Sequence, residues 1–208
     1  MSSPRSRVFL LSPASLAGVR GRALLEGRSS APFLGALSDG GAPLGDVYEF
    51  VSSLYFRGKR AYARAFARPP AGVAGALLIT SSAGLVPDDH PVTMDGLVLM
   101  AGVDIDVGEP RYLDPLRESA RGLASSLGPQ DQVVLLGSLA SDKYVAPLVD
   151  ELGARLVVPL AFVGRGDMSR GGLLLRAVDA GEELDYVSPG SVERRGPRPP
   201  RLQPRRRS

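Results

Sequence analysis

The 208-residue sequence contains no cysteine, and His90 is its only histidine. Without cysteine there is no disulfide, thiolate metal site or cysteine nucleophile, and this absence fits a cytoplasmic protein. A single imidazole argues against a conventional zinc centre, which draws its ligands from several histidines or cysteines. No apolar run approaches the ~18 residues that a membrane-spanning helix needs. We therefore expect a cytoplasmic protein that uses no metal or cofactor and does not contact a membrane.

Lysine is scarce as well, since Lys59 and Lys143 are the only lysines among 25 basic residues. The net charge of +3 is unevenly distributed, because residues 191–208 contain seven arginines and one glutamate. Subtracting this local +6 from the total of +3 leaves −3 for residues 1–190. The segment 191–208 has almost nothing apolar to bury, so we expect a disordered tail after a single domain. Affinity for nucleic-acid phosphates would then come from this tail or from local patches.

Apolar periodicity predicts an alternation of strands and helices. The predicted strands are residues 7–12, 75–82, 132–138, 155–163 and 183–188, with a further strand at 97–106. The predicted helices are residues 14–27, 44–67, 114–128, 141–153 and 170–181. We expect Ser12 and Pro13 to open the first helix, Asp114 to cap the third, and Gly58 to mark a break in the second. Strands separated by helices of this length predict an α/β fold of three layers, with a mostly parallel sheet covered on both faces.

Polar residues follow four of the predicted strands. In open α/β sheets, ligands bind beyond the carboxyl ends of the strands, where helix N-termini leave N–H groups free. Ser12, Ser82 and Ser138 are candidates for such contacts, and helix capping is the alternative for Ser12. Lys143 lies at a helix N-terminus, where a cation is unfavourable, so a bound anion would explain it and a solvated side chain is the alternative.

The segment GRGDMSRGG, residues 164–172, follows the strand 155–163. Arg165 or Arg170 could bind a phosphate or carboxylate through its planar guanidinium, with Asp167 orienting it or accepting a proton. The alternative is an ion-pair frame that only holds the loop. The glycine spacing fits neither the dinucleotide fingerprint nor the phosphate loop, so no nucleoside triphosphate site is predicted.

The turn PDDHP, residues 87–91, brings two carboxylates next to the only histidine. Asp88 or Asp89 could activate water with His90 as proton carrier, while ordinary turn chemistry is the alternative.

One face of the predicted helix 44–67 carries polar and aromatic side chains at three- and four-residue spacing. This face could form a wall against a flat ligand, or it could pack its polar groups against the sheet. Its members are Tyr48, Ser52, Tyr55 and Lys59.

Three segments resemble motifs of the YaaA-like superfamily. FLLSPAS is similar to its SPAK-type opening, LGDVYEFVSSLYF contains its GDVY segment, and LLITSSAGLVPDD resembles its LSGLYGLLxPxD-type segment. The middle of the chain also resembles a bacterial group in which a YxSxxF helix precedes an ILSAKxGLxxPD turn. VGRGDMSRGGLLLR looks like the signature of a narrower family. The resemblance covers less than half of the chain and carries over Ser12, Pro13, Asp46, Tyr48, Gly84, Leu85 and Asp88.

Two lysines of these motifs are serines here, Ser15 and Ser82, which removes a basic group from both positions. The resemblance implies an α/β fold and an association with nucleic acids or their components, since YaaA-like proteins are linked to peroxide stress and DNA binding. It thereby favours a nucleobase, nucleotide or DNA as the partner of this chain.

The leading hypothesis is a pocket at the strand ends that recognises a nucleobase, a nucleotide or a nucleic-acid fragment. An enzyme of this kind would be a hydrolase or transferase acting at an N-glycosidic or phosphate-linked centre, with Asp88 and Asp167 as catalytic candidates. The alternatives are a non-catalytic DNA-binding stress-response protein and a biosynthetic enzyme that has reused the fold. The candidates for substrate binding are Ser12, Asp46, Tyr48, Tyr55, Ser82, Ser138, Lys143, Arg165 and Arg170.

Overall fold

A six-stranded sheet in the order β4-β3-β1-β6-β7-β8 forms the centre of the molecule. The four inner strands are parallel, whereas β4 and β8 run antiparallel at the edges. The computed structural model describes residues 5–52, 54–139, 141–192 and 199–200. The strands are β1 (Arg7–Leu11), β3 (Ala76–Ile79), β4 (Leu85–Pro87), β6 (Gln132–Leu136), β7 (Leu156–Pro159) and β8 (Tyr186–Val187).

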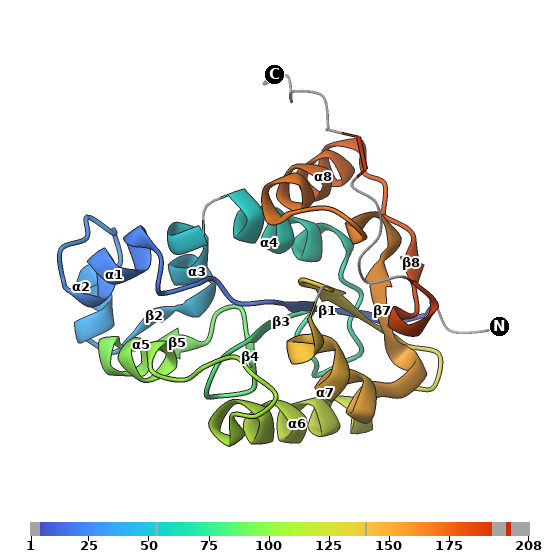
Figure 1. The fold of residues 1–208 in the computed structure, drawn as a ribbon, viewed down its shortest axis with the longest axis horizontal. Coiled ribbons are helices and arrows are strands. Elements are labelled where there is room, and N and C mark those ends of the chain that lie inside the picture. The colour runs from blue at the N-terminus through green and yellow to red at the C-terminus, as the bar shows by residue number, and fades with distance from the viewer. Residues whose placement is uncertain (1–4, 53, 140, 193–198, 201–208) are drawn as a thin grey trace.

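Helices cover both faces of this sheet, which confirms the predicted three-layer α/β fold (Figure 1). Helices α4 (Leu54–Phe66) and α8 (Asp167–Ala180) lie on one face, and α6 (Pro110–Ser125) and α7 (Asp142–Leu152) lie on the other. The inner strands are continuous apolar runs because both of their faces are buried, and residues 8–11 are fully inaccessible to solvent. No helix in the described ranges is long and apolar enough to cross a membrane.

A smaller unit lies beside the sheet, at the left of Figure 1. A two-stranded antiparallel sheet joins its strands β2 and β5, which are far apart in the sequence. Residues 28–43, which lie between the predicted helices 14–27 and 44–67, contain α2 and β2 of this unit. Its elements are α1 (Val19–Leu25), α2 (Leu34–Ser38), β2 (Ala42–Pro43), α3 (Leu44–Ser52), β5 (Pro91–Val92) and α5 (Met94–Ala101).

The predicted strand at 97–106 is wrong, because most of this segment belongs to helix α5 and the loop after it. The Thr93 hydroxyl caps the helix by accepting a hydrogen bond from Gly96 N at 3.2 Å. Leu97 and Met100 are buried at helical spacing while Leu99 between them is exposed. This helical periodicity is not apparent in the sequence, because apolar residues also occupy exposed positions of the helix.

Two predicted helix starts are also wrong. Helix α1 begins at Val19 after Gly18, so Ser12 and Pro13 do not open it. Helix α6 begins at Pro110, where the Glu109 carboxylate accepts a hydrogen bond from Arg111 N at 3.1 Å, and Asp114 lies inside the helix. Ser12 is therefore available for contacts other than capping.

The predicted helix 44–67 is two helices, α3 and α4, and Gly58 lies inside α4 rather than at the interruption. Gly58 permits a close approach to α8: a Cβ at Gly58 would lie 2.8 Å from the carbonyl oxygen of Gly171, and a Cβ at Gly171 would lie 2.8 Å from Tyr55 Cα. The two glycines therefore set how closely α4 packs on α8. Most of the segment 191–208, predicted to be disordered, lies outside the described residues.

Candidate functional site

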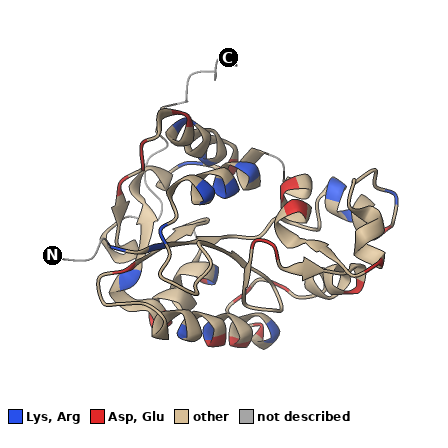
Figure 2. Ribbon diagram, turned by 180° about the vertical axis from the view of Figure 1, so that it is seen from behind, with Lys and Arg blue, Asp and Glu red and all other residues tan. Residues whose placement is uncertain are grey.

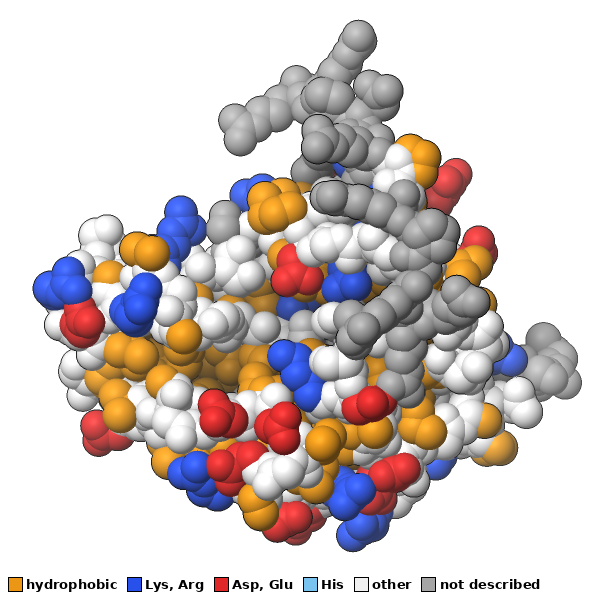
Figure 3. Space-filling model, in the orientation of Figure 1, with side chains coloured by type: hydrophobic (Ala, Val, Ile, Leu, Met, Phe, Trp, Pro, Cys, Tyr) orange, Lys and Arg blue, Asp and Glu red, His pale blue; other side chains and the backbone are white. Residues whose placement is uncertain are grey.

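A cavity of about 470 Å³ opens at the carboxyl ends of the parallel strands. The chain passes from β1 to β3 on one side and then crosses to β6 on the other, so the strand order reverses between β1 and β6. Ligands of open α/β sheets bind at this switch point. Figure 3 shows hydrophobic side chains in a hollow on this face, with acidic and basic side chains at its rim.

The cavity lining contains many of the residues that the sequence had singled out. The loops after β1 and β6 and the first turns of α7 and α8 meet here, as the strand-end rule predicts. The face expected on a single helix is also present, although Tyr48 and Ser52 come from α3 and Tyr55 from α4. The lining residues proposed from the sequence are Ser12, Tyr48, Ser52, Tyr55, Ser138, Lys143 and Asp167.

Ser12 follows β1 directly and is held by a hydrogen bond from its N–H to Leu136 O on β6, at 3.2 Å. Behind it lies Lys59, whose side chain is almost wholly buried, with 1% exposure. Lys59 Nζ donates a hydrogen bond to the Ser12 carbonyl oxygen and lies 3.0 Å from Ser12 Oγ. Burial lowers the pKa of Lys59 to about 7, with Asp167 acting to raise it and Arg170 to lower it further.

Aromatic rings form the inner wall of the cavity. The Tyr48 hydroxyl contacts Met100 Sδ at 3.9 Å, and Tyr144 is buried at the start of α7. Tyr55 is 7% exposed, and its buried hydroxyl lies beside Arg170, which acts to lower its pKa, but donates to no acceptor among the described residues. Burial raises the pKa of all three phenols, so they remain protonated at neutral pH and can donate hydrogen bonds.

The GRGD segment divides its side chains between the cavity and the protein interior. The loop ends at Gly166, and α8 begins at Asp167, which lines the cavity with its side chain 67% exposed. Arg170 is buried and pairs with Asp167 at 3.3 Å, the contact that the ion-pair alternative predicts. Arg165 donates to Ser169 Oγ at 3.2 Å. Neither arginine is part of the cavity lining.

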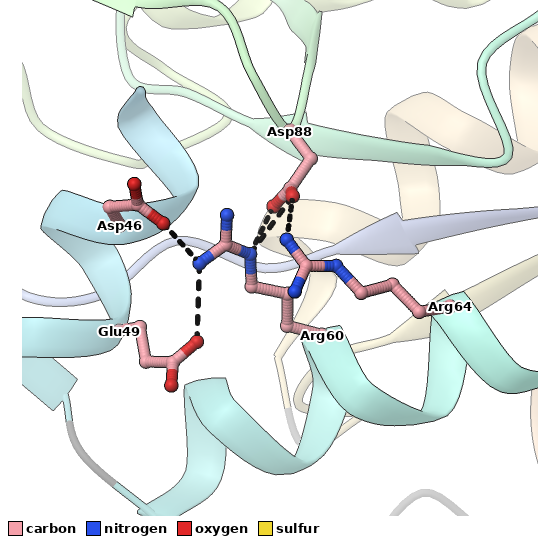
Figure 4. Close-up of polar contacts among 5 residues, drawn as sticks. All are labelled: Asp46, Glu49, Arg60, Arg64 and Asp88. Atoms are coloured by element: carbon pink, nitrogen blue, oxygen red, sulfur yellow. Dashed lines mark hydrogen bonds and ion pairs between the residues drawn. The ribbon is translucent and has the colours of Figure 1, made fainter. Parts of the chain in front are cut away.

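Asp88 lies in a different environment from the one expected of a catalytic base. Both of its carboxylate oxygens accept from Arg60 Nε, at 2.8 and 2.9 Å, and Arg64 donates to it at 3.0 Å (Figure 4). Arg60 also donates to Asp46 at 2.5 Å and to Glu49 at 3.2 Å. Figure 2 shows basic positions on α4 next to acidic positions on α3.

This cluster is a structural clamp between α3, α4 and the turn after β4. Burial alone would lower the pKa of Arg60, but the hydrogen bonds to Asp46 and Asp88 raise it. Gly45 N donates to the Asp88 carbonyl oxygen at 2.9 Å, so the turn also binds α3 through its backbone. Asp46 and Asp88 are not among the residues that line the cavity.

The cavity lining also includes residues that were not among the candidates proposed from the sequence, such as Ser81, Tyr144 and Asp104. Ser81 takes the position expected for its neighbour Ser82, and its hydroxyl donates to Met100 O at 2.6 Å. Tyr144 adjoins Lys143, and no polar pattern distinguishes it from a core residue. Asp104 follows α5 and was concealed by the mistaken strand at 97–106. The signal that could have identified Asp104 as a lining residue was an acidic side chain just after the segment that forms α5.

Lys143 is the basic side chain of the lining, with Asp104 and Asp167 as its carboxylates. Lys143 lies in the first turn of helix α7. The side chain of Ser141, the residue before this helix, makes no capping hydrogen bond. No group of three or more acidic or histidine side chains in the described ranges is placed to hold a metal ion. The arrangement can bind a flat ring against tyrosine and a hydroxylated or anionic group beside Lys143. Comparison with family models, curated proteins and solved structures finds no match for this chain.

Proposed function

We propose that the cavity binds a nucleobase-containing small molecule, a nucleoside or a nucleotide. The observation that supports this most directly is the tyrosine wall of a switch-point cavity, formed by Tyr48, Tyr55 and Tyr144. A volume of about 470 Å³ lies within the usual range of small-molecule sites. The resemblance to the YaaA-like superfamily supports the same class of ligand.

The base would bind against the aromatic wall. Tyrosine rings offer flat apolar surfaces to a heterocycle, and their hydroxyls can donate hydrogen bonds to its ring nitrogens or carbonyl oxygens. The Tyr55 hydroxyl is the best placed for this, because it is buried beside Arg170 and its own proton has no acceptor among the described residues. A buried donor without a partner costs about 1 to 3 kcal/mol, and a ligand acceptor would remove that cost.

The sugar or phosphate would lie toward the start of α7. Lys143 and the helix N-terminus both favour an anionic group there, and Ser138 offers a hydroxyl in the loop after β6. Asp104 and Asp167 are carboxylates that could stabilise an oxocarbenium-like centre. Hydrolysis or transfer at an N-glycosidic bond is therefore the reaction that we propose, with Asp167 rather than Asp88 as the base. The absence of cysteine agrees with a cytoplasmic location.

A thermal-shift screen of the full chain with nucleobases, nucleosides, nucleotides and short DNA, at two salt concentrations, tests this proposal. We expect one small ligand to raise the unfolding midpoint at both salt concentrations, equivalent to about 2.7 kcal/mol at 100 times its Kd. Lys143→Ala and Asp167→Asn should each weaken the effect at least several-fold.

The matched control is Arg121→Ala, which removes an exposed arginine on α6 that pairs with Glu151 at 2.9 Å, away from the cavity lining. It should leave the ligand effect unchanged. Stabilisation by DNA alone, and only at low salt, would favour the DNA-binding alternative. Equal losses in the control and cavity variants would show that the ligand binds elsewhere.

A further inference from the structure

We propose that Ser12 and Lys59 form a nucleophile and general-base pair, and that the cavity transfers or hydrolyses the acyl group of a carboxylic ester through a covalent Ser12 intermediate. The proposal rests on this pair of side chains and does not depend on whether the rest of the cavity binds a nucleobase.

The geometry of the pair is that of an activated serine. Ser12 lines the cavity at the end of β1, and Lys59 approaches it from behind, out of α4. Lys59 Nζ lies 3.0 Å from Ser12 Oγ, within the hydrogen-bond distance that a nucleophile and its base require. The hydrogen bond from Nζ to the Ser12 carbonyl oxygen fixes the amine, so that its lone pair can accept the hydroxyl proton.

A lysine held for structure alone would be expected to pair with a carboxylate. Among the described residues, no carboxylate lies within ion-pair distance of Lys59, although Asp46, Glu49 and Asp88 surround Arg60 one position along α4. Instead the ammonium contacts the rings of Tyr55 and Phe56, at 4.5 and 4.8 Å from their centroids. Contact with the ring faces favours the ammonium, but burial without a carboxylate lowers the pKa of Lys59 and favours the neutral amine, which is the form that can act as a base.

Two charged groups of α8 act on Lys59 in opposite directions. Asp167 raises the pKa of the amine and Arg170 lowers it, so burial dominates and brings it to about 7. A base with this pKa is partly deprotonated at neutral pH, where general-base catalysis is most effective. Tyr55, the remaining polar neighbour, stays protonated because burial raises its pKa.

The reaction balances without a further reagent. Ser12 Oγ attacks the ester carbonyl carbon while its proton moves to Lys59 Nζ. The bond to the leaving alkoxide then breaks, and the alkoxide takes that proton from the ammonium. Water next gives a proton to Lys59 and attacks the acyl group, and Ser12 Oγ recovers the proton as the carboxylic acid leaves.

The developing oxyanion needs hydrogen-bond donors in the cavity. The Tyr55 hydroxyl is buried beside Arg170, its residue lines the cavity, and its proton has no acceptor among the described residues, while its ring packs on the base itself. Tyr55 is thus the side-chain donor that we assign to the oxyanion.

The test uses the full chain and a small fluorophosphonate probe that contains no nucleobase. We expect one label per chain, located at Ser12 by peptide mass spectrometry, with fluoride as the leaving group. The labelling rate should rise from pH 6 to pH 8 with a midpoint near 7, the pKa of Lys59. Hydrolysis of p-nitrophenyl acetate should show the same pH profile.

Ser12→Ala should abolish labelling, and Lys59→Met should slow it by ~100-fold or more. Arg57→Met, which removes an exposed cation two residues earlier on α4, is the matched control and should react like the wild type. Lys59→Met replaces a buried amine by an apolar chain of similar length, and its thermal midpoint at pH 7 should not fall. Lys59→Gln is a second variant of the same residue, and its rate of labelling is measured in the same way.

Three results would overturn the proposal: no labelling of the wild type, labelling at another residue, or a Ser12 label that forms at the wild-type rate without Lys59. A wild-type pH profile that is flat between pH 6 and pH 8 would do the same, even with both lysine variants misfolded. Because the probe carries no base, these outcomes are separate from failure of the nucleoside proposal.

Discussion

Lys59 is the residue whose environment departs furthest from that of an ordinary side chain of its type. Its ammonium is buried at 1% exposure and contacts a carbonyl oxygen, a hydroxyl and two aromatic rings. Burying a charge without a paired carboxylate is costly, so the folded protein favours the neutral amine. Helical spacing predicted that Lys59 shares a face with Tyr55, and the structure confirms this. The contact between Lys59 and Ser12 depends on where β1 places Ser12, so the sequence of α4 alone could not predict it.

Lys59 should therefore make stability depend on pH. Its folded pKa of about 7 lies below the value of 10.5 for an unperturbed lysine. Between these pH values the unfolded chain binds more protons, so stability rises with pH, and below pH 7 the full cost of burying the charge applies. We expect Lys59→Met to exceed the wild type in unfolding free energy most at pH 6 and least at pH 9.

The difference in unfolding free energy between Lys59→Met and the wild type should change by no more than about 1.4 kcal/mol per pH unit, the value for the binding of one proton. Urea unfolding of both proteins at pH 6, 7, 8 and 9 measures it. The difference between the two proteins cancels the contributions of the remaining titrating groups. An equal gap at every pH would contradict a depressed lysine pKa.

Helices α4 and α8 form the element pair that assembles the candidate site. Tyr55 and Lys59 come from α4, and Asp167 comes from the first turn of α8. Gly58 and Gly171 allow the two backbones to approach, since a Cβ at either position would meet backbone atoms at 2.8 Å. Both segments contain glycine, and from the sequence we predicted a helix break at Gly58. The sequence alone cannot reveal that a second helix packs against this glycine.

Gly171→Ala should separate these helices. Its Cβ would meet Tyr55 Cα at 2.8 Å and the Leu54 carbonyl oxygen at 3.0 Å, and both are backbone atoms that cannot rotate away. We expect a loss of about 1 to 3 kcal/mol in unfolding free energy, the usual cost of overpacking. Slower labelling of Ser12 should accompany it, because Tyr55 and Lys59 move with α4.

Gly122→Ala is the matched control within helix α6, where a Cβ would meet nothing within 4 Å. It should raise stability by up to about 1 kcal/mol through helix propensity. Chemical denaturation of the three proteins provides the comparison. A Gly171→Ala protein as stable as the wild type would show that the helices can separate without cost.

At the scale of the whole molecule, the charge is divided between a mildly acidic main part and a basic C-terminal segment. Residues 1–190 carry −3 and residues 191–208 carry +6. The cavity lies at the strand ends between the sheet and the smaller unit, and its lining includes two carboxylates. Pro200 O accepts a hydrogen bond from Arg165 at 3.3 Å, in the loop before α8. Binding of small ligands and binding of nucleic acid are thus expected to be separable.

Truncation after Val192 tests this separation. We expect the shortened protein to keep its thermal midpoint and its response to the cavity ligand, because Val192 still packs on the core and Pro189 stays buried. Binding to short duplex DNA at low salt should be lost with the seven arginines, since it depends on counterion release. Fluorescence anisotropy at two salt concentrations measures this, and equal DNA affinity of both proteins would place the contact on the domain.

The sequence by itself determined the alternation of strands and helices, the mostly parallel sheet, and the polar residues beyond β1 and β6. Buried parallel strands require continuous apolar runs, and their carboxyl ends must meet at one edge. Only the tertiary structure decided the partners of the side chains: Ser12 meets Lys59 from 47 positions away, and Asp88 binds Arg60 instead of entering the cavity. The physical reason is that burial and side-chain direction follow from how α3, α4 and α8 pack together, and no local pattern records that packing.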